Sequence, residues 1–515
     1  MFAQLLSGAT YGVAAYLVAV ETNIAAGYPK FNIVGLPDNA VKESGERVFA
    51  AIKNSGFRYP RGRLSVNLAP ADIRKEGSAF DLPVALSLLL SDRQLESTLK
   101  ETPLVLGELA LDGSVRGVHG VLVVAVEARK KGIRMLMVPK ENAKEAGMVE
   151  GLDVYPMESL KEAAEFLSSE HAMIKPFRVS HKEVFPEEQE YNLDFSDVKG
   201  QETVKRGLEI AAAGGHNIIL IGPPGSGKTM LAKRMPSILP PLTFEEALET
   251  TKIHSVSGIL PPDTALVMAR PFRAPHHTIS DSALVGGGTI PRPGEISLAH
   301  HGVLFLDELP EFARNVLEVM RQPLEDGTVT ISRSRMSVDY PANFMLVCAM
   351  NPCMCGHYGS AIHECSCTPQ QIHKYMGKIS GPLLDRIDIH IEVPVVKYNE
   401  LTTKRGGEAS KAIRNRVMKA RKVQAKRFEG RAGLFANADM ETKEVKEFCH
   451  IDEPGMELLR VAMSRLGLSA RAYDRILKVA RSIADVAGCD SIRPEHVGEA
   501  IQYRSLDRSF YTSMQ

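Results

Sequence analysis

The sequence predicts an α/β protein with an N-terminal α+β domain, a parallel α/β core and a C-terminal helical domain. Three features support this fold class. Short strands rich in β-branched residues alternate with helical periodicity over the first third of the chain. An apolar strand, a glycine-rich loop and a helix follow one another around Gly222, the order expected of a doubly wound core. After Val395 the periodicity is helical throughout.

The N-terminal domain is expected to span residues 1–167. Alternating and helical patterns predict strands at 16–21, 31–34, 64–67, 104–111 and 135–138, and helices at 39–54 and 121–131. Residues 168–194 lose this periodicity and become polar and acidic, which is typical of a solvated linker. A domain boundary is therefore expected there.

The core is expected at residues 195–395 and a helical lid at 396–515. In the core the patterns predict a helix at 204–213 and strands at 217–221, 303–306 and 344–349. In the lid they predict helices at 409–427, 456–466, 470–487 and 494–502.

Composition and charge limit the possible functions. The chain has 515 residues, and its 62 basic and 62 acidic residues give no formal net charge, so any nucleic-acid site must be a local basic patch. The apolar start has no Lys or Arg before Lys30 and is interrupted by polar residues, which predicts strands rather than a signal peptide. No other apolar run approaches the length of a membrane span. We expect a cytoplasmic protein without a membrane partner.

A phosphate loop is predicted between the strand at 217–221 and the next helix. It comprises Gly222, Pro223, Pro224, Gly225, Ser226, Gly227, Lys228 and Thr229. The glycines let backbone N–H groups face phosphate oxygens, and the positive end of the helix attracts the anion. Lys228 is expected to hold the β- and γ-phosphates of ATP, and Thr229 to ligate Mg²⁺.

Two carboxylates follow a second apolar strand at 303–306. Asp307 is expected to hold Mg²⁺ through water, and Glu308 to orient and polarise the attacking water as a general base. The alternative is an acidic start to the next helix, where carboxylates are also favourable. The presence of a complete phosphate loop favours the catalytic interpretation.

Three further side chains are candidates for the γ-phosphate. Asn351 follows the strand at 344–349 and could contact both the γ-phosphate and the catalytic water, although an Asn before a Pro is also a common turn former. Arg386 is expected to reach into a neighbouring subunit's site, and Arg471 to fold over the nucleotide from a lid helix, because added cations stabilise the transition state. Either arginine could instead form a surface ion pair.

Four cysteines lie close together after Asn351. They form the pairs Cys353 and Cys355, and Cys365 and Cys367, on either side of a short loop. Two thiolate pairs at this separation can close around one tetrahedral ion, and Zn²⁺ is the natural choice. His357 or His363 could replace one sulfur, and four free thiols are the alternative.

These motifs in this order resemble the AAA+ superfamily, and a further block narrows the resemblance. The chain resembles the magnesium-chelatase-like ATPases, which include ComM and YifB, in three segments. These are RPFRAPHHT at 270–278, PGEISLAHHGVLFLDE at 293–308 and NPCMCG at 351–356. The resemblance runs nearly end to end. It implies a helix inserted before the acidic motif and a hairpin before Asn351, with strands at 328–332 and 336–340 and with Arg333 and Arg335 at a DNA-binding tip. It also implies a ring, most often a hexamer.

The first domain resembles the Lon-type proteolytic domain through GELALDGSV at 107–115 and the helix and strand that follow. It departs from that family at the catalytic positions. The place of the catalytic lysine is matched by Leu122, and the segment at 75–81 lacks the expected serine motif. Ser78 has no evident Lys or His to activate it. We therefore expect a Lon-like domain without peptidase activity, in a structural or DNA-binding role.

The sequence is compatible with three functions. The first is a DNA-dependent ATPase motor, a ring helicase or branch-migration factor in recombination or natural transformation, acting on single-stranded or branched DNA. The second is a chelatase-type ATPase that remodels a protein partner without nucleic acid, which the absence of net charge mildly favours. The third, a protease component, is disfavoured by the missing Lon dyad. Stimulation of ATPase activity by DNA would separate the first two.

Overall fold

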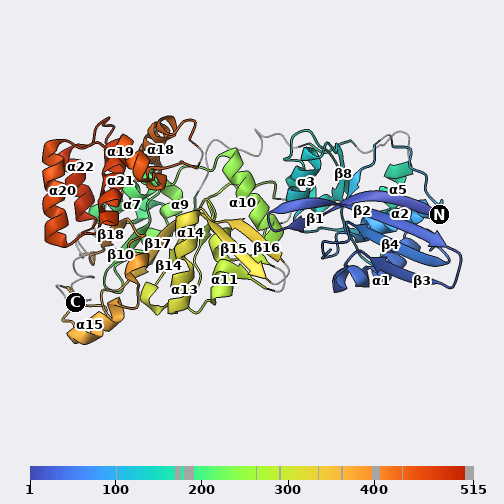
Figure 1. The fold of residues 1–515 in the computed structure, drawn as a ribbon, viewed down its shortest axis with the longest axis horizontal. Helices are drawn as coiled ribbons and strands as arrows, with labels where there is room; N and C mark the ends of the chain where they lie inside the picture. The colour runs from blue at the N-terminus through green and yellow to red at the C-terminus, as the bar shows by residue number, and fades with distance from the viewer. Residues whose placement is uncertain are drawn as a thin grey trace. The chain divides into compact units, whose positions relative to one another are not determined.

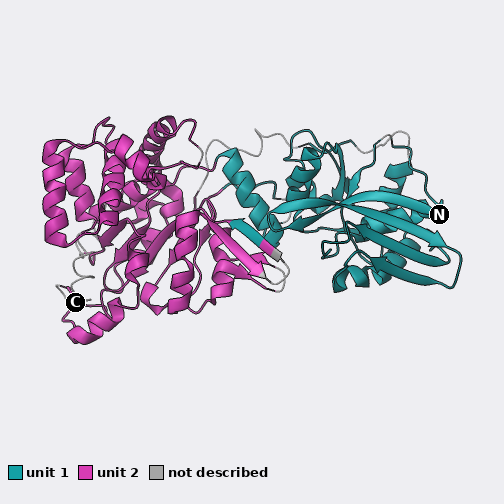
Figure 2. Ribbon diagram, viewed as in Figure 1, with its two compact units in different colours: residues 1–188, 243–268, 338–340 teal, residues 189–242, 269–337, 341–515 magenta. Residues whose placement is uncertain are grey.

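The computed structural model describes residues 1–99, 101–168, 175–178, 191–261, 264–288, 291–333, 336–360, 363–396, 406–431 and 433–504, with residues 333 and 336 as backbone only. Figure 1 labels the helices and strands, and Figure 2 colours the two compact units into which the chain divides. Unit 1 comprises residues 1–188, 243–268 and 338–340, and unit 2 comprises 189–242, 269–337 and 341–515. Each unit is described by itself.

A seven-stranded mixed sheet forms unit 1, in the order β3-β4-β2-β1-β5-β8-β9 (Figure 1). The strands are β1 (Phe2–Tyr11), β2 (Ala14–Ala25), β3 (Lys30–Val34), β4 (Arg63–Ala69), β5 (Leu104–Val105), β8 (Met135–Pro139) and β9 (Asp153–Met157). β1 pairs antiparallel with β2 through a turn at Gly12, whose φ of 60° favours glycine. The pairs β5–β8 and β8–β9 are parallel. The sheet therefore contains both antiparallel and parallel pairs, and the pairs at its β9 edge are parallel.

Helices cover both faces of this sheet. One apolar cluster joins it to α1 (Asn39–Asn54), α2 (Asp81–Ser91) and α5 (Leu160–Ser168). A second cluster joins it to α3 (Val121–Lys130) and α4 (Ala143–Ala146). Unit 1 also holds α10 (Phe244–Ser257) and the short hairpin of β6 (Glu108–Leu109) and β7 (Val115–Arg116).

A five-stranded parallel sheet forms the centre of unit 2, in the order β11-β14-β17-β10-β18. Its strands are β11 (Phe272–Arg273), β14 (Val303–Leu306), β17 (Met345–Met350), β10 (Ile218–Ile221) and β18 (Ile389–Glu392). β10, β14 and β17 are buried along their whole length. This explains their continuous apolar runs, because parallel strands are covered on both faces. Their carboxyl ends meet at one edge of the sheet, where ligands bind in such folds.

Helices and short hairpins complete unit 2. The helices are α7 (Glu202–Gly214), α8 (Lys228–Ala232), α9 (Met235–Ile238), α11 (Asp281–Val285), α12 (Glu295–Leu298), α13 (Arg314–Val319), α14 (Arg321–Asp326), α15 (Pro369–Met376), α16 (Gly381–Leu384), α18 (Ser410–Arg427), α19 (Thr442–Phe448), α20 (Glu453–Leu466), α21 (Ala470–Val486) and α22 (Pro494–Gln502). The hairpins are β12 (Gly286–Gly287) with β13 (Arg292–Pro293), and β15 (Thr328–Arg333) with β16 (Met336–Pro341). Part of β16 is grouped with unit 1.

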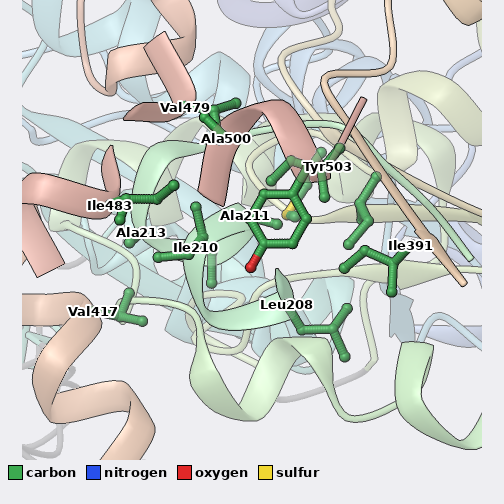
Figure 3. Close-up of a cluster of buried hydrophobic side chains, with 14 of the residues drawn as sticks. Leu208, Ile210, Ala211, Ala213, Ile391, Val417, Val479, Ile483, Ala500 and Tyr503 are labelled. Atoms are coloured by element: carbon green, nitrogen blue, oxygen red, sulfur yellow. The ribbon is translucent and has the colours of Figure 1, made fainter. Parts of the chain in front are cut away.

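The core of unit 2 joins the parallel sheet to the C-terminal helices. Figure 3 shows Leu208 and Ile210 of α7 in one buried cluster with Ile391 of β18 and Tyr503. Val417 of α18 belongs to the same buried cluster. The C-terminal helices therefore share one apolar core with the sheet.

Most of the predicted elements are present. The helix at 39–54 has the predicted limits, as does the helix at 494–502. The strand expected at 104–111 is wrong in its length, since β5 ends at Val105 and the chain then leaves the large sheet to form β6 and β7. The mixed α/β architecture with a parallel core agrees with the predicted class.

Candidate functional site

The phosphate loop joins the end of β10 to the start of α8, as the motif predicts. Gly225 and Gly227 have φ values of 76° and 88°, which are strained for other residues. A Cβ atom on Gly222 would lie 2.2 Å from the Val393 carbonyl oxygen, a backbone atom. Three glycines are therefore required by the shape of the loop, which leads into the positive end of α8.

Lys228 is buried at the base of this loop. Its Nζ donates hydrogen bonds to the carbonyl oxygens of Gly222 and Pro223, at 2.7 and 2.9 Å, and to Asn351 Oδ1 at 3.1 Å. Burial lowers the pKa of Lys228, while the charges of Asp307 and Glu308 oppose that shift. The ammonium group and the Asn351 amide, which follow the neighbouring strands β10 and β17, thus meet at one point.

Thr229 and Asp307 also come together. The Thr229 hydroxyl donates a 2.6 Å hydrogen bond to Asp307 Oδ2, which brings the first helical turn of α8 to the end of β14. Hydroxyl and carboxylate oxygens are the hard ligands that Mg²⁺ prefers. The pair fits the magnesium site expected from the sequence.

Glu308 has an unusual backbone and an accessible side chain. Its φ is 52°, a region that non-glycine residues rarely adopt and that is concentrated at functional sites. The side chain is 59% exposed, and its Oε2 lies 3.6 Å from Nδ1 of His277. Solvent access is compatible with the predicted role of Glu308 as a general base, and His277 is a neighbour that was not identified from the sequence.

Arg386 is buried, and it is paired within its own chain. Its guanidinium donates to Glu325 and, at 2.5 Å, to the Pro382 carbonyl oxygen. Burial lowers the pKa of Arg386, and the charges of Arg321, Arg471 and Arg475 lower it further. The charge of Arg471 thus acts on Arg386, and the contacts of Arg386 lie outside the phosphate loop.

A buried polar network anchors the first turns of α21, which carries Arg471. Asp388, immediately before β18, accepts a 2.7 Å hydrogen bond from Arg475, and its other oxygen lies 3.0 Å from Nδ1 of His216. Burial opposes ionisation of Asp388, but Arg475 and His216 outweigh it and hold its pKa well below the usual range. None of these three residues was singled out from the sequence, because their contacts join distant parts of the chain.

The four predicted cysteines gather at one point. The Sγ atoms of Cys353, Cys355 and Cys365 lie 3.4, 3.6 and 3.7 Å apart, and Cys367 completes a set within 4.8 Å. Zn–S bonds of 2.3 Å in a tetrahedron place sulfur atoms about 3.8 Å apart, whereas a disulfide would require about 2 Å. The donor set therefore fits a tetrahedral zinc ion better than a disulfide.

The cysteine loop also touches the phosphate loop. Gly356 has a φ of 83°, and a Cβ atom there would lie 2.5 Å from Cδ of Pro224. The backbone N–H of Tyr358 donates to Cys353 Sγ at 3.3 Å. Gln201 makes a further contact with the phosphate loop, since its side-chain amide donates to the Ser226 carbonyl oxygen at 2.8 Å. Gln201 was not identified from the sequence, because it belongs to no recognisable motif.

The hairpin predicted before Asn351 is present as β15 and β16. Val329 and Ile331 of β15 are buried. The predicted DNA-binding tip cannot be placed, since Arg335 and the side chain of Arg333 lie outside the described residues.

None of the helices in the described part of the chain is both long and apolar enough to cross a membrane.

Comparisons with known proteins agree with these observations. Three family models match: magnesium chelatase subunit ChlI over residues 194–401, subunit ChlI of Mg-chelatase over 20–142, and the ChlI C-terminal region over 407–504. The competence protein ComM of Haemophilus influenzae is 45% identical over 510 residues, 98% of each chain. YifB of Escherichia coli is 45% identical over 97% of this chain and 96% of its own. The magnesium-chelatase 38 kDa subunit of Rhodobacter capsulatus is 24% identical over 40% of this chain and 60% of its own.

The relatives are similar to this chain over almost its whole length. The phosphate loop, a threonine–aspartate pair and an asparagine meet at the edge of one parallel sheet. The chain therefore belongs to the magnesium-chelatase-like AAA+ ATPases, in the family of ComM and YifB.

Proposed function

We propose that this protein is an ATP-driven ring motor that acts on single-stranded or branched DNA, as a helicase or branch-migration factor in recombination or natural transformation. The observation that carries the ATPase part is the meeting of Lys228 with Asn351 and of Thr229 with Asp307. The DNA part is supported by the relative named as a competence protein and by the hairpin of β15 and β16.

In the proposed hydrolysis of ATP, each side chain of the site has one role. Thr229 and Asp307 would hold Mg²⁺, which supplies positive charge to the phosphates. Lys228 neutralises charge on the β- and γ-phosphates, which requires it to exchange its carbonyl partners for phosphate oxygens. Glu308 accepts a proton from the attacking water, and Asn351 orients that water against the γ-phosphate.

A homo-hexameric ring completes the site. AAA+ sites are open on one side, and a head-to-tail contact repeated around an axis closes that side. Arg386 acts on ATP that is held by the neighbouring subunit, so its pairing with Glu325 must open when the ring assembles. Arg471 closes over the nucleotide from residues 396–515, the helical lid.

The cysteine cluster holds Zn²⁺ as a structural ion. The spacing of its sulfur atoms supports this assignment. Because the loop starts two residues after Asn351 and packs against Pro224, the ion stiffens the segment between the γ-phosphate and Arg386.

The Lon-like domain at residues 1–167 serves as a tier on the ring without peptidase activity, joined to the core at 195–395 by the linker at 168–194. The Ser78 hydroxyl donates to Glu108, and Lys75 Nζ donates to the Ile73 carbonyl oxygen. A serine nucleophile needs a base that accepts its proton, and lysine serves in that role only when it points at the hydroxyl. We place the protein in the cytoplasm.

The test is ATPase activity with and without DNA. Turnover of the full chain should rise with single-stranded or forked DNA, and the stimulation should weaken steeply with added salt, because phosphate contacts release counterions. The Lys228→Ala variant serves as the control for contaminating ATPases. Activity that DNA leaves unchanged at low salt would reject the DNA motor.

A second function is supported by other observations. The chain has no net charge, and part of it matches a magnesium-chelatase subunit. On this alternative the ring remodels a protein partner and does not bind nucleic acid. Basal ATPase activity that is insensitive to every DNA form would favour it.

A further inference from the structure

An open hollow of about 580 Å³ lies in unit 1, among residues that the ATP site does not use. It is formed by the start of β3, the C-terminal half of α1 and the loop that leads into β4. Sites that hold small molecules or single groups of a larger ligand have volumes of roughly 300–1,000 Å³. The hollow is therefore large enough to receive a ligand group.

Four basic side chains line the hollow, and no acidic residue does. They are Lys30, Lys53, Arg58 and Arg61. The side chain of Arg58 is 71% exposed, and its ion pair with Asp92 is long at 3.4 Å, so the pair contributes little. In a chain without net charge, this is the kind of local basic patch that an anionic partner requires.

Four aromatic rings lie among these cations. They are Phe31, Phe49, Phe57 and Tyr59. The ring of Phe49 is 37% exposed and packs edge-on against Tyr59, with centroids 4.7 Å apart. Tyr28, next to the lining residue Pro29, is 91% exposed. Lys53 Nζ lies over the Phe49 ring, 4.2 Å from its centroid, so a base that stacks on this ring replaces the ammonium group, which can then pair with a phosphate.

The wall of the hollow is held in place. The backbone N–H of Arg58 donates to Gln94 Oε1 at 2.9 Å, and the Phe57 N–H donates to the Ile52 carbonyl oxygen at 3.1 Å. Burial, helped by the charge of Glu46, raises the pKa of Tyr59 to about 12, so its hydroxyl stays neutral at physiological pH. The aromatic and basic groups are thus preorganised, which reduces the entropy cost of binding.

We infer that this hollow binds a segment of single-stranded nucleic acid, with bases stacked on Phe49 and its neighbouring rings and phosphates paired with the surrounding lysines and arginines. Sequence-independent single-strand sites combine these two features, a cationic surface that follows the backbone and aromatic rings on which bases stack. An acidic peptide would match the cations but leave the rings uncovered.

This inference shares with the proposed function the assumption of a nucleic-acid partner, and it adds a binding site in unit 1, separate from the predicted hairpin tip at Arg333 and Arg335. The two can fail separately. The proposed motor is tested by DNA-stimulated ATPase activity, whereas this site is tested by what a probe placed in the hollow detects.

The chain contains no tryptophan, which permits a probe without background. In Phe49→Trp the indole should report base stacking as quenched fluorescence when unlabelled oligo(dT) is added to the full chain. The matched control is Phe435→Trp, at a residue of unit 2 that is 61% exposed, where no quenching is expected. An abasic phosphodiester strand keeps the charge without the bases, and it should leave the signal of Phe49→Trp unchanged.

A second measurement tests the cations. The double variant Lys53→Glu with Arg61→Glu should bind labelled oligo(dT) at least about tenfold more weakly, and its logarithmic salt dependence should fall by about 1.4, or 0.7 for each lost phosphate contact. The control is Lys131→Glu with Lys161→Glu, two exposed lysines of unit 1 outside the hollow, which makes the same change in net charge. Its affinity should stay within about twofold.

Quenching at Phe49→Trp, together with a selective loss in the hollow variant, supports the site. Oligo(dT) that binds the chain in anisotropy without quenching this probe, or with equal losses in both double variants, overturns the inference while leaving the motor intact. If oligo(dT) does not bind the chain at all, the inference fails, while the DNA motor is still decided by ATPase stimulation with forked DNA.

Discussion

Arg386 provides a direct test of the proposed ring, because its position predicts which properties survive its removal. Within one chain it pairs with Glu325 and the Pro382 carbonyl oxygen rather than with the phosphate loop. Arg386→Ala is therefore expected to bind ATP almost normally. Its turnover should fall by roughly 10³ or more, the scale of an arginine that stabilises the transferred phosphoryl group.

Mixing two inactive chains supplies the measurement. Arg386→Ala keeps Glu308, and Glu308→Gln keeps Arg386. If the two chains are mixed one to one and assemble at random in a head-to-tail ring, about a quarter of the interfaces pair an intact Glu308 with an intact Arg386 from the neighbour. Phosphate release should therefore recover to at most about a quarter of the activity of the unaltered chain, with a maximum near equal mixing.

Stability must be controlled, because Arg386 is only 7% exposed. Its loss leaves the half-buried Pro382 carbonyl group without this donor, at a cost of up to about 1–3 kcal/mol, so thermal unfolding of each variant should be measured first. Arg386→Lys keeps the charge but loses the planar fork, and it should recover little turnover. If the inactive chains co-assemble and show no recovery at any ratio, even as a tethered dimer, the arginine does not act between subunits.

Three further predictions concern the ATP site, the cysteines and the buried network. Lys228→Ala should abolish tight ATP binding, whereas Glu308→Gln should bind ATP and arrest hydrolysis, because it removes only the base; near-normal turnover in Glu308→Gln would reject that role. Metal analysis should return about one zinc ion per chain, lost in Cys353→Ser with Cys367→Ser, and a metal-free chain that is folded and active would contradict the zinc site. Asp388→Asn should lower the free energy of unfolding by about 3–5 kcal/mol at neutral pH. Since the folded-state pKa of Asp388 is lowered, that difference should shrink as pH falls below about 4, and a pH-independent difference in chemical denaturation would refute the linkage.

The sequence predicted elements whose periodicity is strong. α1 has its expected limits, because five buried residues lie on one face and Asp38 caps its first turn. The strands β10, β14 and β17 appeared as continuous apolar runs that end in the phosphate loop, Asp307 and Asn351. Local sequence was sufficient there, since parallel strands and their carboxyl-end loops carry both the fold and the ligand.

Other parts of the fold could not be predicted, for two physical reasons. α2 is buried on nearly every side, so its apolar run carries no helical periodicity. The contacts of Gln201, His277 and Glu325 join residues that are far apart in the sequence, and no local pattern records them. Propensity and spacing describe neighbours along the chain, whereas these partners are chosen by tertiary packing.

The cysteine loop and the phosphate loop meet in a way that connects the two predicted centres. Asn351 holds Lys228, and two residues later Cys353 begins the cluster, while Gly356 packs against Pro224 without space for a Cβ atom. A phosphate that draws Lys228 away from Asn351 breaks a hydrogen bond made by this segment. If the cysteines bind one ion, as we propose, the segment is stiff, and a displacement of Asn351 would be transmitted along it toward Arg386. The cluster thus has a physical reason to lie between Asn351 and Arg386 and not elsewhere on the surface.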